Sequence, residues 1–226
     1  MIPWERLDAA DVPGESQPLV LWRRGGEYVI RVGAVALMSS TAHGSEEALA
    51  ERACAHVAAR TGARVLVGGL GMGFTLAAAL RVLRADAVVH VAELVPAVVA
   101  WNRGALAHLA GRPLEDPRVT AIEGDVGACI TGARGTYDAI LLDVDNGPGG
   151  FTRAGNDALY GAAGLAACRR ALTPGGALGV WSVAADAAFE RRMAAAGFDV
   201  ETLAPRSRGG RGGRHTLWIG LARSSG

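Results

Sequence analysis

The stretch Val65-Leu66-Val67-Gly68-Gly69-Leu70-Gly71-Met72-Gly73 is a short apolar run that leads into closely spaced glycines. A helical pattern begins directly after it, at Phe74. This order predicts a buried strand, a tight turn and a helix. Because glycine has no Cβ, such a turn can adopt positive φ and lets a ligand lie directly against the backbone. We therefore interpret residues 68–73 as a candidate ligand cradle.

Strands and helices alternate after Gly62, which is typical of a parallel sheet covered by helices on both faces. The segment Arg206–Arg214 is short and rich in arginine and glycine, so it predicts an antiparallel connection between the last two strands and a mobile loop. We predict an α/β, Rossmann-like fold with seven strands, at Arg64–Val67, Ala87–Glu93, Val119–Glu123, Tyr137–Asp143, Ala177–Ser182, Asp199–Leu203 and Thr216–Ala222. The main helices are predicted at Phe74–Arg84, Pro96–Ala110, Asp157–Leu172 and Asp186–Gly197.

The chain before this region predicts a smaller β element. Three β-like runs, Leu19–Trp22, Tyr28–Val32 and Val35–Met38, are broken by glycines. A helical pattern then begins at Ser45, with Glu46 and Glu47 at its positive end. We expect a small antiparallel β-hairpin element at residues 1–44 and a ligand-binding Rossmann-like domain at residues 45–226.

Composition narrows the function class. The chain has 226 residues, of which 50% are hydrophobic, and this suits one well-buried α/β core. Its net charge of +1 gives no reason to expect a nucleic acid or a membrane as partner. Its first residues do not form a signal peptide, and its three cysteines have neither disulfide-framework nor zinc-site spacing. We expect a cytoplasmic protein that acts on a small molecule and holds no metal.

Glu93 is a second candidate ligand-binding residue beside the glycine turn. It ends the next predicted strand, twenty positions after Gly73, where a carboxylate can accept hydrogen bonds from both hydroxyls of a ribose. The glycines alone could serve only the packing of helix against strand. Together with Glu93 they favour a nucleotide-like ligand.

The whole pattern resembles a known fold. A terminal antiparallel pair of strands is similar to the seven-stranded sheet of class I S-adenosylmethionine-dependent methyltransferase-like proteins and unlike the usual dinucleotide domain. Within that fold, most of the chain resembles the spermidine synthase (polyamine aminopropyltransferase) family. Besides the glycine turn, the resembling stretches are His90–Val99, Asp116–Val119, Gly124-Asp125, Tyr137–Asp143, Leu159-Tyr160 and Arg169–Gly176.

The resemblance implies a cofactor and roles for particular residues. The cofactor is S-adenosylmethionine or its decarboxylated form. Asp125 either contacts adenine or caps the next helix, and both alternatives stay open. The resemblance further implies a cofactor floor at Gly68, Gly69, Gly71 and Gly73, ribose binding by Glu93, deprotonation of the incoming amine by Asp143, and acceptor contacts at His43, Asn146 and Tyr160.

Two departures from the family pattern shape the expected reaction. Gly71 stands where the family has an Asp that helps to select the decarboxylated cofactor, so a like-charge penalty against intact S-adenosylmethionine is absent at this position. Asn146 stands where the family has a second Asp that holds the diamine; either Asp145 compensates, or the acceptor is not putrescine. We expect transfer of a methyl group, or of another alkyl group, to a small amine or related nucleophile, with aminopropyl transfer as the alternative and a non-catalytic cofactor-binding partner or sensor as a third hypothesis.

Asp143 and Asp145 are the candidate catalytic residues. Asp143 ends the predicted fourth strand and Asp145 follows it, at the edge where open α/β folds bind ligands. A protonated amine needs a carboxylate that binds it and takes its proton. The alternative for Asp145 is an Asx-type turn. His43 is either a base or cofactor contact or a solvated loop residue, and a homodimer is compatible with the resemblance.

Overall fold

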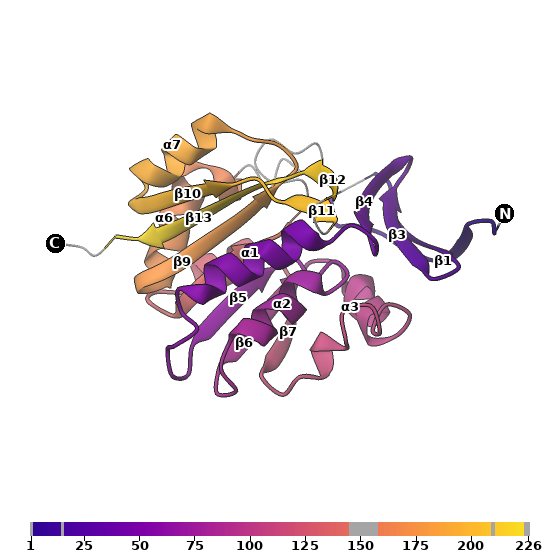
Figure 1. The fold of residues 1–226 in the computed structure, drawn as a ribbon, viewed down its shortest axis with the longest axis horizontal. Helices are drawn as coiled ribbons and strands as arrows, with labels where there is room; N and C mark the ends of the chain where they lie inside the picture. The colour runs from indigo at the N-terminus through magenta and orange to yellow at the C-terminus, as the bar shows by residue number, and fades with distance from the viewer. Residues whose placement is uncertain (1, 15, 145–157, 209–210, 224–226) are drawn as a thin grey trace.

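The computed structural model describes residues 2–14, 16–144, 158–208 and 211–223. These residues form an α/β body and a smaller antiparallel sheet that projects from one side of it (Figure 1). Asp145 and Asn146 lie outside the described residues, so their predicted roles stay predictions.

The body is built on the predicted seven-stranded sheet. Its strand order is β10-β13-β9-β8-β5-β6-β7; β13 is antiparallel to its neighbours β9 and β10, and the β9-β8-β5-β6-β7 pairings are parallel. The carboxyl ends of β8, β5, β6 and β7 therefore meet at one edge. The strands are β5 (Arg64–Gly68), β6 (Val88–Glu93), β7 (Val119–Glu123), β8 (Tyr137–Leu142), β9 (Leu172–Ser182), β10 (Phe198–Leu203) and β13 (Thr216–Ala222).

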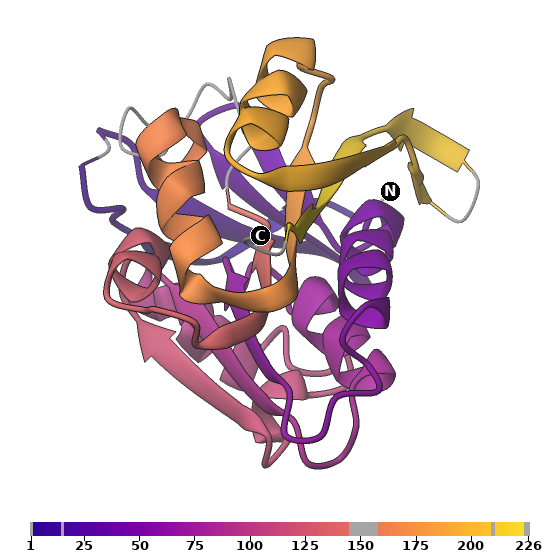
Figure 2. The same cartoon turned by 90° about the vertical axis from the view of Figure 1, so that its left-hand side faces the viewer.

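Helices cover both faces of this sheet (Figure 2). Alternate side chains of a strand point to opposite faces, so Val65 and Val67 pack into one core while Leu66 packs into the other. One face carries α1 (Gly44–Ala55), α2 (Phe74–Val82) and α3 (Pro96–Arg103), and the other carries α4 (Val126–Thr131), α6 (Ala162–Ala171) and α7 (Ala187–Ala195). A short 3-10 turn, η1, lies at Pro113–Glu115.

The smaller sheet has four antiparallel strands in sequence order, one more than the sequence predicts. Its strands are β1 (Glu5–Ala10), β2 (Leu19–Arg24), β3 (Glu27–Val32) and β4 (Val35–Ser39). Leu21 and Ile30 pack into the same core as α1 and α2, and Trp101 Nε1 of α3 donates a hydrogen bond to Asp8 Oδ2 at 2.7 Å. These contacts hold the small sheet beside the carboxyl edge of the large one.

Three element boundaries differ from the prediction. The helix predicted to Ala110 ends at Arg103, because the backbone of Gly104 is not helical. Strand β9 begins at Leu172 rather than after Gly176, and its register with β8 shifts across the Pro174-Gly175-Gly176 turn. The segment predicted as a mobile loop instead contains a two-stranded hairpin, β11 (Arg206–Arg208) and β12 (Arg211–Arg214).

Candidate functional site

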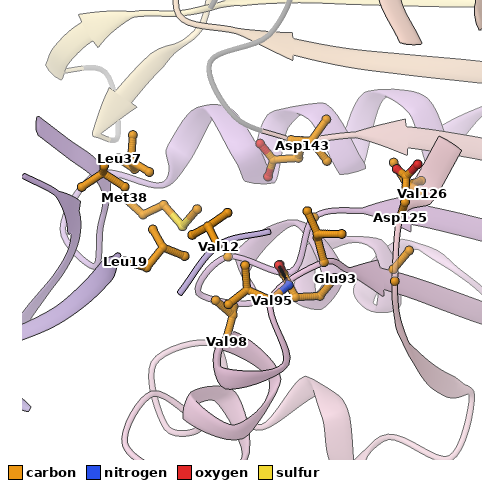
Figure 3. A pocket seen from close by; sticks show the side chains of 17 residues that line it. Val12, Leu19, Leu37, Met38, Glu93, Val95, Val98, Asp125, Val126 and Asp143 are labelled. Carbon is orange, nitrogen blue, oxygen red and sulfur yellow. Dashed lines mark hydrogen bonds between the residues drawn. The ribbon is translucent and has the colours of Figure 1, made fainter. Parts of the chain in front are cut away.

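A cleft of about 880 Å³, its open mouth included, lies between the carboxyl edge of the large sheet and the small sheet. Apolar side chains of the small-sheet region, among them Leu19, Leu37 and Met38, face Glu93 and Asp143 across it (Figure 3). The lining residues are Val12, Leu19, Val32, Leu37, Met38, Gly69, Gly71, Ala92, Glu93, Leu94, Val95, Val98, Gly124, Asp125, Val126, Asp143 and Val144. An elongated ligand with an apolar body and a few polar groups suits this surface.

The glycine turn forms part of the cleft floor. Gly69 and Gly71 line the cleft and have φ of +85° and +53°. A Cβ on Gly69 would lie 2.3 Å from the Asp143 carbonyl oxygen, so this position requires glycine. Gly68 and Gly73 are not among the lining residues; a Cβ on them would meet Val126 and Asn102 side chains, respectively. Two of the four predicted floor glycines thus lie in the floor, and two serve packing beside it.

Glu93 lies at the end of β6 with its carboxylate fixed toward the cleft. Oε2 accepts a hydrogen bond from Leu70 N at 3.0 Å, and Oε1 accepts one from Val95 N at 2.9 Å. Burial raises the pKa of Glu93 despite these bonds. The backbone N–H groups of Gly71 and Leu94 also act to lower the pKa of Glu93, so a ligand hydroxyl would share this carboxylate with backbone donors.

Asp125 lies one strand farther along the same edge. It is exposed, lines the cleft and caps α4, since its Oδ1 accepts a hydrogen bond from Gly127 N at 2.9 Å. The helix cap is therefore present, and the cleft position is compatible with the ligand contact as well. The predicted role at adenine stays a prediction.

Asp143 follows β8 and is held by a short hydrogen bond. Thr75 Oγ1, in the first turn of α2, donates to Asp143 Oδ2 at 2.5 Å. Burial raises the pKa of Asp143 to about 6, although the bond from Thr75 opposes this change. A carboxylate with such a pKa is ionised at neutral pH and can still take up a proton there.

A second cavity, of about 590 Å³ with its open side included, adjoins the cleft. Gly71 and Asp143 line both cavities, as do Leu37 and Met38. The other lining residues are Ser39, Glu46, Leu70, Met72, Phe74, Thr75 and Trp181. Asp143 thus faces two adjoining spaces, one beside Glu93 and one beside α1.

Sequence analysis missed three residues of this second cavity. The sequence placed Glu46 at the positive end of the first helix and gave no site role to it, to Thr75 or to Trp181. Burial, followed by the charge of Asp143, raises the pKa of Glu46 to about 7. The available signal for Glu46 is its position three residues after His43, a predicted acceptor contact.

His43 and Tyr160, two predicted acceptor contacts, lie outside the described lining of both cavities. The His43 ring stacks on Phe74 with centroids 3.9 Å apart, and Phe74 itself lines the second cavity. Tyr160 is buried in the core beneath the sheet, where its hydroxyl donates to Val144 O at 3.3 Å. His43 is therefore one ring removed from the second cavity, and Tyr160 supports the residue after Asp143.

Comparisons with known proteins give a result only at the level of structure. No family model and no curated protein matches the sequence. Spermidine synthase from Thermotoga maritima superposes with a TM-score of 0.74 at 14% identity, covering 96% of this chain and 72% of its own. The fold is that of the spermidine synthases. A spermidine synthase bound to the transition-state analogue AdoDATO gives a TM-score of 0.73 at 15% identity, again over 96% of this chain and 72% of its own.

A probable spermidine synthase from Corynebacterium glutamicum has the same spermidine synthase-like fold, with a TM-score of 0.65, 15% identity and coverage of 96% of this chain and 79% of its own. The shared fold confirms the predicted seven-stranded sheet and small N-terminal sheet. Within the described ranges, no helix is long and apolar enough to span a membrane, and no group of three or more His, Cys, Asp or Glu side chains is placed to hold a metal ion.

Proposed function

We propose that this protein is a transferase that moves the aminopropyl group of decarboxylated S-adenosylmethionine to a small amine. The observation that carries the proposal is the position of Asp143, which faces both the cleft beside Glu93 and the adjoining second cavity. Two reactants that meet at one carboxylate need such an arrangement. The spermidine synthase neighbours, which cover nearly all of the chain, support the same reaction.

The residues along the sheet edge fit an adenosyl group. Strand order puts Asp143, the glycine turn, Glu93 and Asp125 in succession from β8 to β7. Glu93 would accept the ribose hydroxyls, and Gly69 and Gly71 would let the ribose and sulfonium approach the backbone. Leu94 and Val126 supply apolar surface for the base beside Asp125. Read from Asp125 to Asp143, these residues follow the order of adenine, ribose and sulfonium along an adenosyl compound.

The second cavity fits an amine. The acceptor arrives as an ammonium ion, and its nitrogen becomes a nucleophile only after it loses a proton. Asp143 would bind the ammonium and take that proton, while Thr75 keeps the carboxylate in place. The nitrogen lone pair then attacks the carbon next to sulfur, the carbon–sulfur bond breaks, and the thioether leaves as a neutral group. The apolar walls of the cleft would exclude water from this step.

Methyl transfer is the main competing reaction. The sequence favours it because Gly71 lacks the family's carboxylate, but the structural neighbours support aminopropyl transfer better. A non-catalytic sensor would need the adenosyl cleft but not a carboxylate that lines a second, adjoining cavity, as Asp143 does. We therefore place aminopropyl transfer ahead of methyl transfer, which the sequence alone favoured.

The test is turnover with an amine panel and each of the two sulfonium compounds. Purified protein is expected to alkylate a small diamine from the decarboxylated compound, as read by mass spectrometry of the amine. Asp143→Asn should lower kcat on the order of a hundredfold or more while methylthioadenosine still binds. Undiminished turnover by Asp143→Asn would remove Asp143 as the base, and the absence of turnover with every amine would favour the sensor.

A further inference from the structure

The second cavity has an unbalanced charge. Among its described lining residues, two are ionisable, Glu46 and Asp143, and both are acidic; none is basic. The other lining residues carry no charge: Ser39 and Thr75 have hydroxyl groups, and the rest are apolar or aromatic, including Phe74 and Trp181. An anionic ligand group in this space would meet two carboxylates without a cation, whereas an ammonium would meet two partners and aromatic faces.

Glu46 is held in this cavity by a buried hydroxyl. Ser45 is fully buried, and its Oγ donates to Glu46 Oε2 at 2.5 Å. Trp181 Nε1 donates to the same Oγ at 3.0 Å, and His215 Nδ1 lies 2.7 Å from it. Because the hydroxyl has one proton, which bonds Glu46, both nitrogens act as donors when Glu46 is ionised. Three segments far apart in sequence therefore fix the position of one carboxylate.

Glu47, the residue after Glu46, has a different environment that suits a purely structural role. Glu47 also lies in the first turn of α1, but it faces Arg81 at 3.4 Å and His43 at 3.5 Å near the surface. Glu47 can complement the positive end of the helix from there. Helix stability thus does not explain why Glu46 is turned inward, next to Asp143, where burial and that charge raise its pKa to about 7. A carboxyl group whose pKa is raised by burial and by a neighbouring acidic residue is typical of a binding or catalytic position.

We propose that Glu46 selects the ligand of the second cavity by charge, accepting an alkylammonium group and rejecting one that carries a carboxylate. Ser45 and His215 are positioning residues that act through Glu46. The inference rests on the proposed function for the adenosyl part of the ligand. The alkylammonium has two sources, the tail of decarboxylated S-adenosylmethionine and the amine acceptor, and the experiment separates them.

Calorimetry with the whole protein tests the proposal without turnover, at about pH 8.5, where free carboxyl groups are ionised. The ligands are both sulfonium compounds and methylthioadenosine, which has no charged tail. Wild type should bind the decarboxylated compound roughly tenfold or more tighter than the intact one. Glu46→Gln should reduce that ratio by a similar factor and leave methylthioadenosine unchanged. Glu47→Gln, the matched control, should behave as wild type.

A diamine titration distinguishes the two sources of the ammonium. It is performed on the ligand-free protein and on the methylthioadenosine complex. If Glu46→Gln weakens the diamine but not the sulfonium preference, Glu46 serves the acceptor; the reverse result assigns it to the cofactor tail. Both results support the proposal. Unchanged affinities for all of these ligands in Glu46→Gln, or tighter binding of the diamine or of the decarboxylated compound by Glu46→Gln than by wild type, would overturn it.

The same titrations separate this inference from the proposed function. If no adenosyl compound binds but diamine binding depends on Glu46, the proposed function fails and the inference stands. If methylthioadenosine binds and Glu46→Gln changes nothing, the inference fails alone. Ser45→Ala should lower the ammonium preference several-fold at constant methylthioadenosine affinity, and Ser45→Thr should restore part of it. A purely structural serine would weaken all ligands together.

Discussion

Replacing Asp143 with asparagine should stabilise the ligand-free protein at high pH. Burial raises the pKa of Asp143 from 3.8 to about 6, so the folded state binds more protons than the unfolded state between these values. Stability from this group is therefore present below pH 3.8, falls as pH rises through the window, and stays reduced above about 6. Two pKa units correspond to about 3 kcal/mol. The charges of Asp143 and Glu46 interact, so only part of this energy belongs to Asp143 alone. We therefore expect Asp143→Asn to add about 1–3 kcal/mol to the free energy of unfolding at pH 8.

Urea unfolding of wild type and variant from pH 4 to pH 8 measures this difference. The gain should be small at the acid end and reach its plateau above about pH 6–7. Asp138→Asn on the same strand is the matched control with opposite sign. Burial opposes ionisation of Asp138, but hydrogen bonds from Arg64 N and the Arg60 guanidinium outweigh it and lower its pKa. Its variant should lose stability at pH 8. A pH-independent gain, or a loss, for Asp143→Asn would refute the reasoning.

Three further predictions concern the site. Glu93→Gln should weaken methylthioadenosine binding roughly tenfold or more, as measured by calorimetry; an unchanged affinity would remove Glu93 from ribose recognition. Gly69→Ala should cost several kcal/mol of unfolding free energy in urea titrations, because its Cβ would lie 2.3 Å from the Asp143 carbonyl oxygen; tolerance of alanine would show that the turn rearranges. The kcat/KM for the amine should rise with pH as Asp143 and Glu46 ionise, with apparent pKa values of about 6 and about 7, and then level off; a fall across this range would contradict a carboxylate base.

The sequence predicts the sheet well because its signals are local. Apolar runs such as Val65–Val67 mark buried strands, and the positive φ of Gly69 and Gly71 requires residues without a Cβ. Strand β1 was missed for the opposite reason. Its sequence, Glu5–Ala10, has no β-branched residue, and it is a strand because it pairs with β2 and because Asp8 bonds Trp101.

The candidate site was predicted only where it follows the strand ends. Glu93, Asp125 and Asp143 lie at one edge because parallel strands put them there. The environment of Glu46 depends on Trp181 and His215, which are 136 and 170 residues from Ser45, and no local pattern encodes such contacts. The sequence also shows that Gly71 lacks the family's carboxylate, but it does not show that Glu46 of α1 supplies a carboxylate to the same cavity.

A competition between the two sulfonium compounds tests the central claim most directly. Wild-type protein receives intact and decarboxylated S-adenosylmethionine at equal concentration with one small diamine, and the nucleoside products are separated. Aminopropyl transfer predicts methylthioadenosine as the main product, together with an amine extended by a three-carbon aminoalkyl group. S-adenosylhomocysteine as the main product, with a methylated amine, would contradict the account.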